Sequence, residues 1–222
     1  MDLVNPITSF SMIWLSFLLA AVLLVFSIVL APWEKIQRDS DAQNVYLGTI
    51  VLLYLIWMIR ADLPTGLNFH LLGASLVCLL FEWQFALFAT ATVTALHTGL
   101  GNLPWMNYAL NWLTLGAVPV IFTRLMLYIV QRYLPHNFFI YIFINAFFVA
   151  GIGVYLAGGI SAIWLYFLQD YPAHLVFDQY IPTLLLIMFP EAACTGIVMT
   201  MLVAYKPTWV ATFHDRWYLK SR

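Results

Sequence analysis

The fold of this chain is decided by residues 69–98, FHLLGASLVCLLFEWQFALFATATVTALHT. Glu82 is the only acidic or basic residue in this stretch when histidine is counted as neutral. A helix that crosses the hydrocarbon core of a bilayer needs about 20 residues, each rising about 1.5 Å. The stretch is therefore either one overlong helix or two short helices that turn at Glu82 and Trp83.

The composition excludes a soluble protein. Only 9% of the 222 residues are charged and 64% are hydrophobic, whereas a soluble domain carries about 25% charged residues. The outer surface must therefore face lipid, and the length allows a single integral membrane domain over residues 1–222, without a separate ATPase. The net charge of −1 indicates no partner, and no nucleic acid is expected to bind.

Apolar runs interrupted by proline or by charges predict the other spans. The first starts at Asn5-Pro6, a capping residue followed by a proline suited to the first helical position. A kink is expected at Pro119. Residues 207–222 mix aromatic with basic side chains, which is typical of a short interfacial tail on the cytoplasmic side. The predicted spans outside the opening stretch are 6–31, 45–59, 105–133, 138–168 and 181–205.

The distribution of basic residues decides between one and two helices in the opening stretch. With two helices, all but one of the cations near span ends fall on one side, and only Arg60 lies opposite. The positive-inside rule then places this side in the cytoplasm. The sequence thus predicts an all-α polytopic bundle of about seven transmembrane helices in the inner membrane, two of them short or broken, with the N-terminus outside. The cations on the inner side are Lys35, Arg38, Arg132, Lys206, Arg216, Lys220 and Arg222.

Four polar side chains are predicted to lie near the outer ends of the spans, where the N-terminus also lies: His70, His97, Asn107 and Asn111. With Asn68 as a helix cap, His70 would sit at the positive end of a helix, which keeps an imidazole neutral and able to bind metal. Other roles stay open. His70 can be a hydrogen-bonded interface residue, His97 a helix C-cap, and Asn111 an interhelical hydrogen-bond residue.

Glu191 is the most unusual residue, because it lies within an apolar run directly after Pro190. A carboxylate inside a membrane indicates a functional site by default. The alternative is that it satisfies backbone groups that the proline leaves free. Arg124 and Asn145 are expected at a similar depth in the inner half and are candidates to pair with each other.

No enzyme motif is present in the sequence. It has no HExxH zinc motif and no phosphate-binding loop, so the chain is not expected to catalyse a reaction or to hydrolyse a nucleotide itself.

Three segments resemble a known family. Residues 64–76, Pro-Thr-Gly-Leu-Asn-Phe-His-Leu-Leu-Gly-Ala-Ser-Leu, resemble the His-Leu-Leu-Gly-Ala segment of the cobalt and nickel substrate-binding permeases of energy-coupling-factor (ECF) transporters, the CbiM/NikM type. Residues 94–101, followed by Asn107 and Asn111, are similar to the family's glycine loop and asparagine-bearing helix. Residues 190–196, followed by Lys206-Pro207, are similar to its last span.

The resemblance implies a small helical bundle that captures a divalent metal from outside. It also implies a separate transmembrane coupling (T) protein and cytoplasmic ATPase subunits as partners. The metal-binding histidine of the family corresponds to His70. Seven spans with an outside N-terminus agree with the topology drawn from the charges.

The chain departs from the family at position 2. Members that transport metal begin Met-His, and their terminal amine, the next amide and that histidine surround the metal in a plane. Here the second residue is Asp2, so a square-planar nickel or cobalt site cannot form in the same way. Either His97 and an outer carboxylate replace the missing imidazole, or the substrate differs.

The leading hypothesis is a substrate-binding subunit for Ni, Co, Cu or Zn ions, with His70 and His97 as metal ligands and Asp2, Asn107 or Asn111 as further site residues. No tightly bound cofactor is expected. One alternative is a membrane accessory protein that does not transport and assists metalloenzyme assembly. Another is a haem-binding membrane protein with His70 and His97 as axial ligands.

Overall fold

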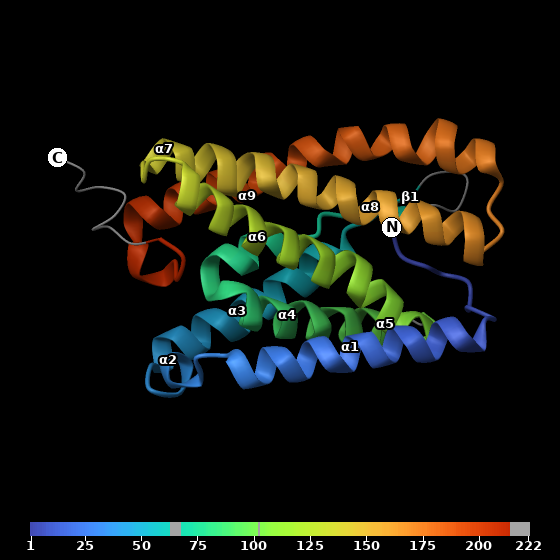
Figure 1. The fold of residues 1–222 in the computed structure, drawn as a ribbon, viewed down its shortest axis with the longest axis horizontal. Coiled ribbons are helices and arrows are strands. Elements are labelled where there is room, and N and C mark those ends of the chain that lie inside the picture. The colour runs from blue at the N-terminus through green and yellow to red at the C-terminus, as the bar shows by residue number, and fades with distance from the viewer. Residues whose placement is uncertain (63–67, 102, 214–222) are drawn as a thin grey trace.

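A computed structural model of the chain describes residues 1–62, 68–101 and 103–213 and shows an elongated helical bundle (Figure 1). Two short strands form an antiparallel pair, with Ala61 opposite Phe69 and Asp62 opposite Asn68. The elements in chain order are α1 Phe10–Leu30, α2 Trp33–Gln37, α3 Ser40–Met58, β1 Ala61–Asp62, β2 Asn68–Phe69, α4 Ala74–Leu100, η1 Trp105–Asn107, α5 Tyr108–Asn111, η2 Trp112–Ala117, α6 Val118–Tyr133, α7 Phe138–Ile140, η3 Tyr141–Phe148, α8 Val149–Leu168, η4 Leu175–Tyr180, α9 Ile181–Tyr205 and η5 Pro207–Trp209.

Helix α4 is broken at Glu82, which confirms the predicted turn. Glu82 has φ 69° and ψ 164°, outside the helical region. A straight helix over the length of α4 would hold its ends about 40 Å apart, yet the ring centroids of His70 and His97 are only 6.0 Å apart. The chain therefore runs along the bundle and returns, and Lys35 binds Glu82 at the turn with an N–O distance of 2.8 Å.

The C-terminal segment closes the end of the bundle at which α4 turns. Because the helix stops at Glu82, the carbonyls of Leu79 and Leu80 lack the partners that a continuous helix would supply. The hydroxyl of Thr212 donates to the Leu79 carbonyl, and the amide of Ala211 donates to the Leu80 carbonyl. Val210 and Phe213, in the first part of the tail that the sequence predicts at the interface, are buried against this end of the bundle. Residues 214–222 lie outside the described part of the chain.

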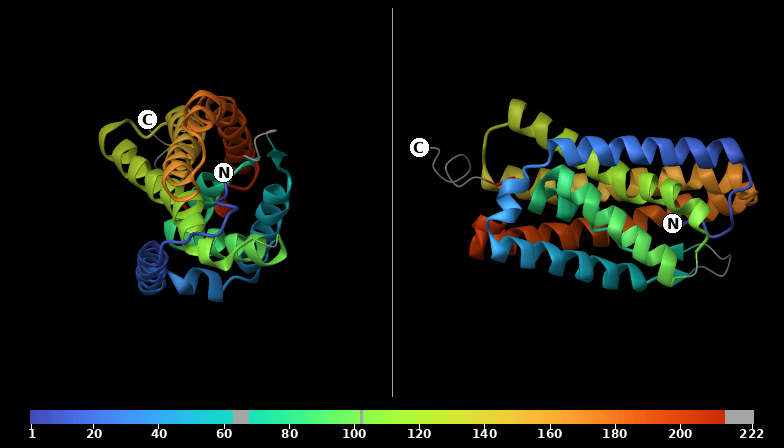
Figure 2. Two further views of the ribbon diagram at one scale, coloured as in Figure 1. Left: turned by 90° about the vertical axis from the view of Figure 1, so that its right-hand side faces the viewer. Right: turned by 90° about the horizontal axis from the view of Figure 1, so that it is seen from below.

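The first helix begins later than its sequence predicts. Residues 1–9 are not helical, and α1 starts at Phe10 rather than at Pro6. The side chains of Asn107 and Gln169 both donate to the Asn5 carbonyl. These tertiary hydrogen bonds outweigh the local preference of Asn5-Pro6 to start a helix. An end-on view shows the N-terminus in the middle of the bundle and α1 at its periphery (Figure 2).

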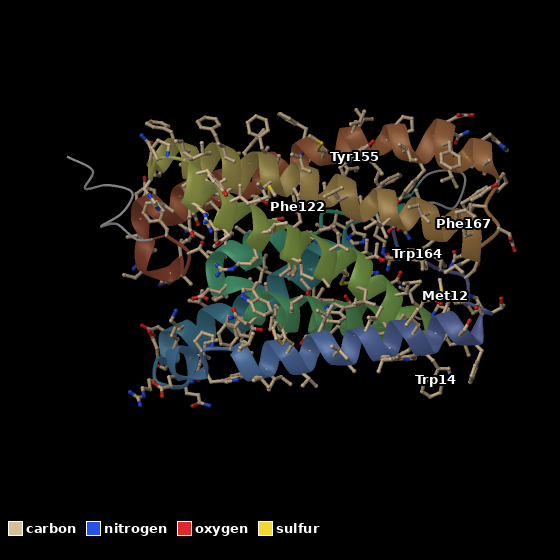
Figure 3. All side chains as sticks on the ribbon, in the orientation of Figure 1. Met12, Trp14, Phe122, Tyr155, Trp164 and Phe167 are labelled. Carbon is tan, nitrogen blue, oxygen red and sulfur yellow. The ribbon has the colours of Figure 1, made fainter. Side chains whose placement is uncertain are left out.

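Helix α1 contacts the bundle through a narrow stripe of small residues. Its buried residues are Ser16, Ala20 and Ser27, and the Ser27 hydroxyl donates to the Gln84 carbonyl. The opposite face is apolar and exposed, and Trp14 points away from the other helices (Figure 3). A long apolar helix with this surface belongs in lipid.

The remaining long runs agree with the predicted spans, except that the last begins at Leu175 rather than at residue 181, and three of them contain π-helical turns. The turn Trp112–Ala117 directly precedes Pro119, where a kink is expected. Small residues on α8 form a packing seam, since Gly153, Ala157 and Ser161 are all buried.

Among the described residues, five helices are long and apolar enough to cross a membrane: 10–30, 74–100, 105–133, 138–168 and 175–205. Helix α4 contains two passes, and α3 adds a helix of 19 residues. The protein is thus a polytopic helical membrane bundle, and the count of seven crossings stays a prediction.

Candidate metal site

The segment before α1 threads into the bundle and is held there by two asparagines. Asn107 donates to the carbonyls of Leu3 and Asn5 and accepts from the amide of Ile7. Asn111 accepts from the amide of Leu3 at 2.9 Å. These side chains replace the backbone partners that an irregular buried segment lacks. Both asparagines therefore position the N-terminal segment, and neither contacts His70 or His97 in a hydrogen bond of the described structure.

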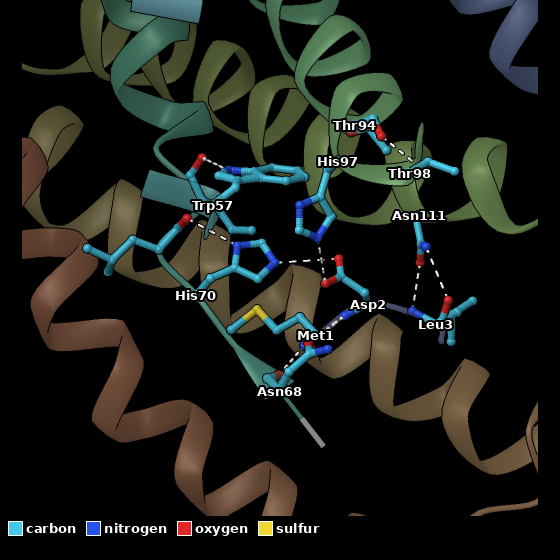
Figure 4. A network of polar contacts seen from close by, with 12 residues as sticks. Met1, Asp2, Leu3, Trp57, Asn68, His70, Thr94, His97, Thr98 and Asn111 are labelled. Carbon is cyan, nitrogen blue, oxygen red and sulfur yellow. Dashed lines mark hydrogen bonds and ion pairs between the residues drawn. The ribbon is translucent and has the colours of Figure 1, made fainter. Parts of the chain in front are cut away.

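The carboxylate of Asp2 lies between two histidines (Figure 4). Asp2 Oδ1 is 3.5 Å from His70 Nε2, and Asp2 Oδ2 is 3.3 Å from His97 Nε2. All three side chains are almost fully buried, with at most 3% of each side chain exposed. Three elements far apart in sequence therefore meet at one end of the bundle: the N-terminal segment, the segment before α4 and the last turn of α4.

His70 presents an unpaired nitrogen to this carboxylate. Its Nδ1 is 3.2 Å from the Leu71 carbonyl, which can only accept, so Nδ1 carries a proton. Its Nε2 is buried and makes no hydrogen bond. A nitrogen lone pair facing a carboxylate at this distance is repulsive unless a proton or a metal cation lies between them. A hydrogen bond from the other ring nitrogen is the usual way in which a ligand histidine is oriented.

The backbone around His70 differs from the sequence-based expectation. His70 does not open a helix, because residues 68–69 form β2 and α4 begins only at Ala74 after Gly73, whose φ is 61°. Asn68 is not a helix cap either. It accepts hydrogen bonds from the Met1 amine, through both its backbone carbonyl and Oδ1, and from the Asp2 amide. The predicted effect of a helix dipole on His70 is therefore wrong.

Trp57 forms one wall of the site. Its indole is 4.8 Å from the His70 ring and 5.8 Å from the His97 ring, measured between centroids. Its Nε1 donates to the Leu72 carbonyl at 3.0 Å. The indole thus packs against both imidazoles and also holds the extended segment that carries His70.

Asp2 is ionised in this setting. Burial by itself would raise the pKa of its carboxyl. The positive charge of a protonated His70, the neighbouring His97 ring and the Met1 amine outweigh burial, and the pKa of the carboxyl lies well below the ordinary value. The Asp2 carboxylate is therefore a negatively charged group beside the positive charge of the Met1 amine.

Glu191 contacts the same extended segment from α9. Its two carboxylate oxygens accept from the amides of Leu72 and Gly73, each at 2.8 Å. The sequence pattern left open whether Glu191 is functional or satisfies backbone groups near Pro190. In the structure Glu191 accepts hydrogen bonds from the backbone amides of Leu72 and Gly73, which are remote in sequence, rather than pairing with backbone groups next to Pro190.

The other two intramembrane polar residues lie away from this site. Arg124 is exposed, and Asn145 is fully buried with no hydrogen bond to its side-chain amide. The pairing of these two residues suggested by the sequence does not occur.

The site is open rather than preformed. Among the described residues, no three His, Cys, Asp or Glu side chains are already grouped so as to hold a metal ion. Asp2 turns a different oxygen to each ring, so capture of a cation requires a small rotation of this carboxylate. The donor types, two imidazoles and one carboxylate, suit a divalent transition metal.

Residues 6–209 match the family model described as the cobalt uptake substrate-specific transmembrane region, CbiM. This chain belongs to the CbiM family. As a CbiM-family protein it is a multi-pass membrane component of transition-metal uptake and not an enzyme. The match begins after Asp2 and therefore does not test the difference at position 2 that the resemblance implies. No curated protein matches the sequence.

Two crystal structures share the fold of this CbiM-family chain at low sequence identity. One, described as a truncated transition metal transporter, has a TM-score of 0.74 at 14% identity and covers 92% of this chain and 99% of its own. The other, described as a transition metal transporter, has a TM-score of 0.73 at 15% identity, with coverage of 92% and 93%.

Sequence reasoning did not single out two residues of the site. Trp57 lies in an apolar span with eight other tryptophans in the chain to choose from, and only its contact with both rings distinguishes it. The sequence predicts Asn68 to be a helix cap, which the structure does not show. Its position two residues before His70 could have indicated a role in the site. Its hydrogen-bond partners, Met1 and Asp2, are however remote in sequence.

Proposed function

We propose that this chain is the substrate-binding subunit of an ECF-type transporter and takes up a divalent transition-metal ion at an outward-facing site formed by His70, His97 and Asp2. The observation that carries the proposal is the buried Asp2 carboxylate between two histidine Nε2 atoms. One carboxylate and two imidazoles are donor types that suit a divalent transition-metal ion. The unpaired Nε2 of His70 supplies a nitrogen donor aimed at the same place.

Metal accumulation by cells tests this function. Cells that express the chain with its coupling genes should accumulate the transported ion, and the His70→Ala variant should lose most of that accumulation. The His174→Ala variant is the matched control, because His174 is exposed in the helical turn directly before η4. Equal accumulation by His70→Ala and wild type, at equal expression, would refute the histidine site.

The proposed partners are a T protein and cytoplasmic ATPases. A groove of about 920 Å³ at the end that carries the Glu82 turn supports this part of the proposal. It lies between α2, α3 and residues 207–213, and its polar lining includes Lys35, Asp39 and Asp41. Accumulation should stop when the ATPase genes are deleted; accumulation that persists would contradict the partnership.

The haem alternative fits the site poorly. Axial ligands must face each other across the whole macrocycle, whereas the Asp2 carboxylate occupies the space between the two Nε2 atoms and Trp57 packs against both rings. A Soret band in the purified protein would reverse this conclusion. A non-transporting accessory role predicts metal binding without accumulation, so the accumulation experiment distinguishes it from uptake.

A further inference from the structure

Helix α6 turns one charged side chain to the lipid-facing surface of the bundle. Arg124 is exposed, and its Cα lies about 13 Å by helix rise from the end of α6 at Tyr133. The apolar run 105–133 is about 43 Å long, whereas the hydrocarbon core of a bilayer is about 30 Å thick. When the run is centred on the core, Arg124 leaves the backbone about 7 Å inside the edge of the hydrocarbon.

The backbone of α6 directs the Arg124 side chain away from the nearer headgroups. The Cα–Cβ bonds of an α-helix tilt toward its N-terminus, and α6 runs from Val118 toward the end of the bundle with the Glu82 turn (Figure 1). The side chain therefore starts out toward the middle of the bilayer. Long basic side chains near helix ends reach the headgroups, but Arg124 would have to bend back along its own helix to do so.

The described chain offers Arg124 no counter-charge. In the part of the chain that the structure describes, Arg124 forms no ion pair and no hydrogen bond. Glu82 is bound to Lys35 at 2.8 Å, and Glu191 is buried and accepts from two backbone amides of the segment before α4. An arginine keeps its charge in proteins, and a charge in hydrocarbon is costly. The compensating group must therefore come from outside the described chain.

The side chains around Arg124 are apolar and suited to contact with another helix. Ile121 and Tyr128 lie one turn away on either side, and Leu125 adjoins Arg124 in sequence; each of the three is between 44% and 51% exposed. Membrane helices associate by close packing and by polar groups that pair between them. This face of α6 offers both an apolar surface and an unpaired polar group.

A second copy of this chain does not supply the missing carboxylate. The described long apolar helices contain Glu82, Asp178 and Glu191 as their only acidic residues. Asp178 is exposed but lies in the first turn of the run 175–205, at the histidine end of the bundle. A parallel pair of copies would therefore place no free carboxylate at the depth of Arg124.

We infer that the face of α6 formed by Ile121, Arg124, Leu125 and Tyr128 docks a transmembrane helix of a second protein, and that this helix presents a carboxylate to Arg124. The carboxylate neutralises the guanidinium within the hydrocarbon, where an ion pair is screened least. The inference goes beyond the proposed function and does not depend on the metal site, because it holds whether or not the histidines bind an ion.

The experiment measures binding of synthetic transmembrane peptides to the purified full chain in phosphatidylcholine vesicles. The peptides are leucine-rich helices with one glutamate, or with one glutamine as the uncharged match, a third of the way along. Energy transfer from a fluorophore on the exposed Cys194 to a labelled peptide reports binding. We expect the glutamate peptide to bind wild type roughly tenfold more tightly than the glutamine peptide.

Variants of α6 assign this preference to one side chain. Arg124→Gln should abolish the preference for glutamate, and Arg124→Lys should retain most of it because the charge is kept. Arg132→Gln is the matched control, since Arg132 is also exposed on α6 but lies near its end and donates to the Tyr128 hydroxyl. Thermal unfolding of each variant in detergent establishes that it is folded, and Arg124→Leu is available as a second neutral variant.

Equal binding of the two peptides to wild type would overturn the inference, since lipid phosphate would then satisfy Arg124. A preference for glutamate that persists in Arg124→Gln would also overturn it. So would a preference that appears only in Glu82→Gln, because Arg124 would then pair with Glu82 of its own chain. Metal retention by the same preparations is measured separately, so failure of the docking surface leaves the proposed function standing.

Discussion

At the scale of single residues, the N-terminal segment depends on asparagine side chains. A buried backbone amide or carbonyl without a partner costs about 1–3 kcal/mol, and residues 1–9 form no regular structure that would pair such groups. Asn68, Asn107 and Asn111 supply the missing partners from three places in the chain. This arrangement fixes Asp2 between His70 and His97.

Replacing Asn107 by alanine should loosen this segment. The change removes hydrogen bonds to Leu3, Asn5 and Ile7 together, and we expect a loss of about 1–3 kcal/mol in the free energy of unfolding. Amide hydrogen exchange of residues 3–9 should become faster. Asn44→Ala is the matched control, since Asn44 is exposed on α3. Equal exchange in the two variants would show that Asn107 does not hold the segment.

Some residues of the site can be predicted from the sequence because they are polar side chains within apolar runs, whereas the contacts between them cannot. His70, His97, Asn107 and Asn111 stand out because polar side chains are costly in apolar runs, and charge bias placed them at one end. The contact of Asp2 with both histidines could not be read from the sequence. It depends on an irregular segment whose course is set by tertiary hydrogen bonds, against a local capping preference.

At the scale of elements, the extended segment before α4 is fixed from two sides. Trp57 of α3 binds the Leu72 carbonyl, while Glu191 of α9 binds the amides of Leu72 and Gly73. Backbone that is not helical at membrane depth is tolerated only where protein groups satisfy it. Glu191 is therefore a positioning residue, which orients the segment that carries His70.

Exchange of Glu191 for glutamine should weaken this attachment. Glutamine keeps one acceptor oxygen but turns an NH₂ group toward an amide donor, so one buried N–H loses its partner. We expect a loss of about 1–3 kcal/mol in stability, measured as a lower melting temperature in detergent, together with weaker metal binding. Glu34→Gln is the control, because the Glu34 side chain is 81% exposed. A melting temperature equal to that of wild type would remove Glu191 from this role.

The contact between α8 and α9 depends on a glycine without a side chain. A Cβ atom at Gly158 would lie 2.3 Å from Leu184 Cδ2, whereas nothing lies within 4 Å of a Cβ at the neighbouring Gly159. Gly158→Ala should therefore destabilise the protein by about 1–3 kcal/mol through overpacking. Gly159→Ala should be neutral or stabilise it by up to about 1 kcal/mol. Thermal unfolding of the two variants checks this, and equal melting temperatures would contradict it.

Element boundaries show where sequence reasoning reaches its limit. The turn at Glu82 was predictable because a charge interrupts an apolar run that is too long for one span. The helix start at Ala74 was not, because residues 68–73 are apolar enough to continue a helix. Pairing with Ala61 and Asp62 and hydrogen bonds from Trp57 and to Glu191 keep them extended instead.

At the scale of the whole molecule, the two ends of the bundle differ in charge. The described cations Lys35, Arg38, Arg132 and Lys206 lie at the end with the Glu82 turn, and Arg60 lies at the histidine end, with its guanidinium 3.4 Å from a Cβ placed at Gly101. The positive-inside rule predicts that the histidine end faces outward. The count of seven crossings and this orientation are both predictions, and both rest on the same distribution of basic residues.

Cysteine labelling tests the orientation. In a background with Cys78 and Cys194 replaced by alanine, a cysteine at Arg60 should react with a membrane-impermeant maleimide in intact cells. A cysteine at Gln37 should react only after the membrane is permeabilised. The opposite result would reverse the topology, and reaction of both in intact cells would exclude a pass between α2 and β1.

The central claim is that His70, with His97 and Asp2, binds the transported ion. The most direct test is the metal content of the purified chain after equilibration with Zn²⁺, Co²⁺ or Ni²⁺ and removal of excess ion. Wild type and the exposed-site control His174→Ala should retain about one ion per chain, and His70→Ala should retain nearly none at the same melting temperature in the absence of metal. Equal retention by His70→Ala and wild type, or no retention by either, would contradict the claim.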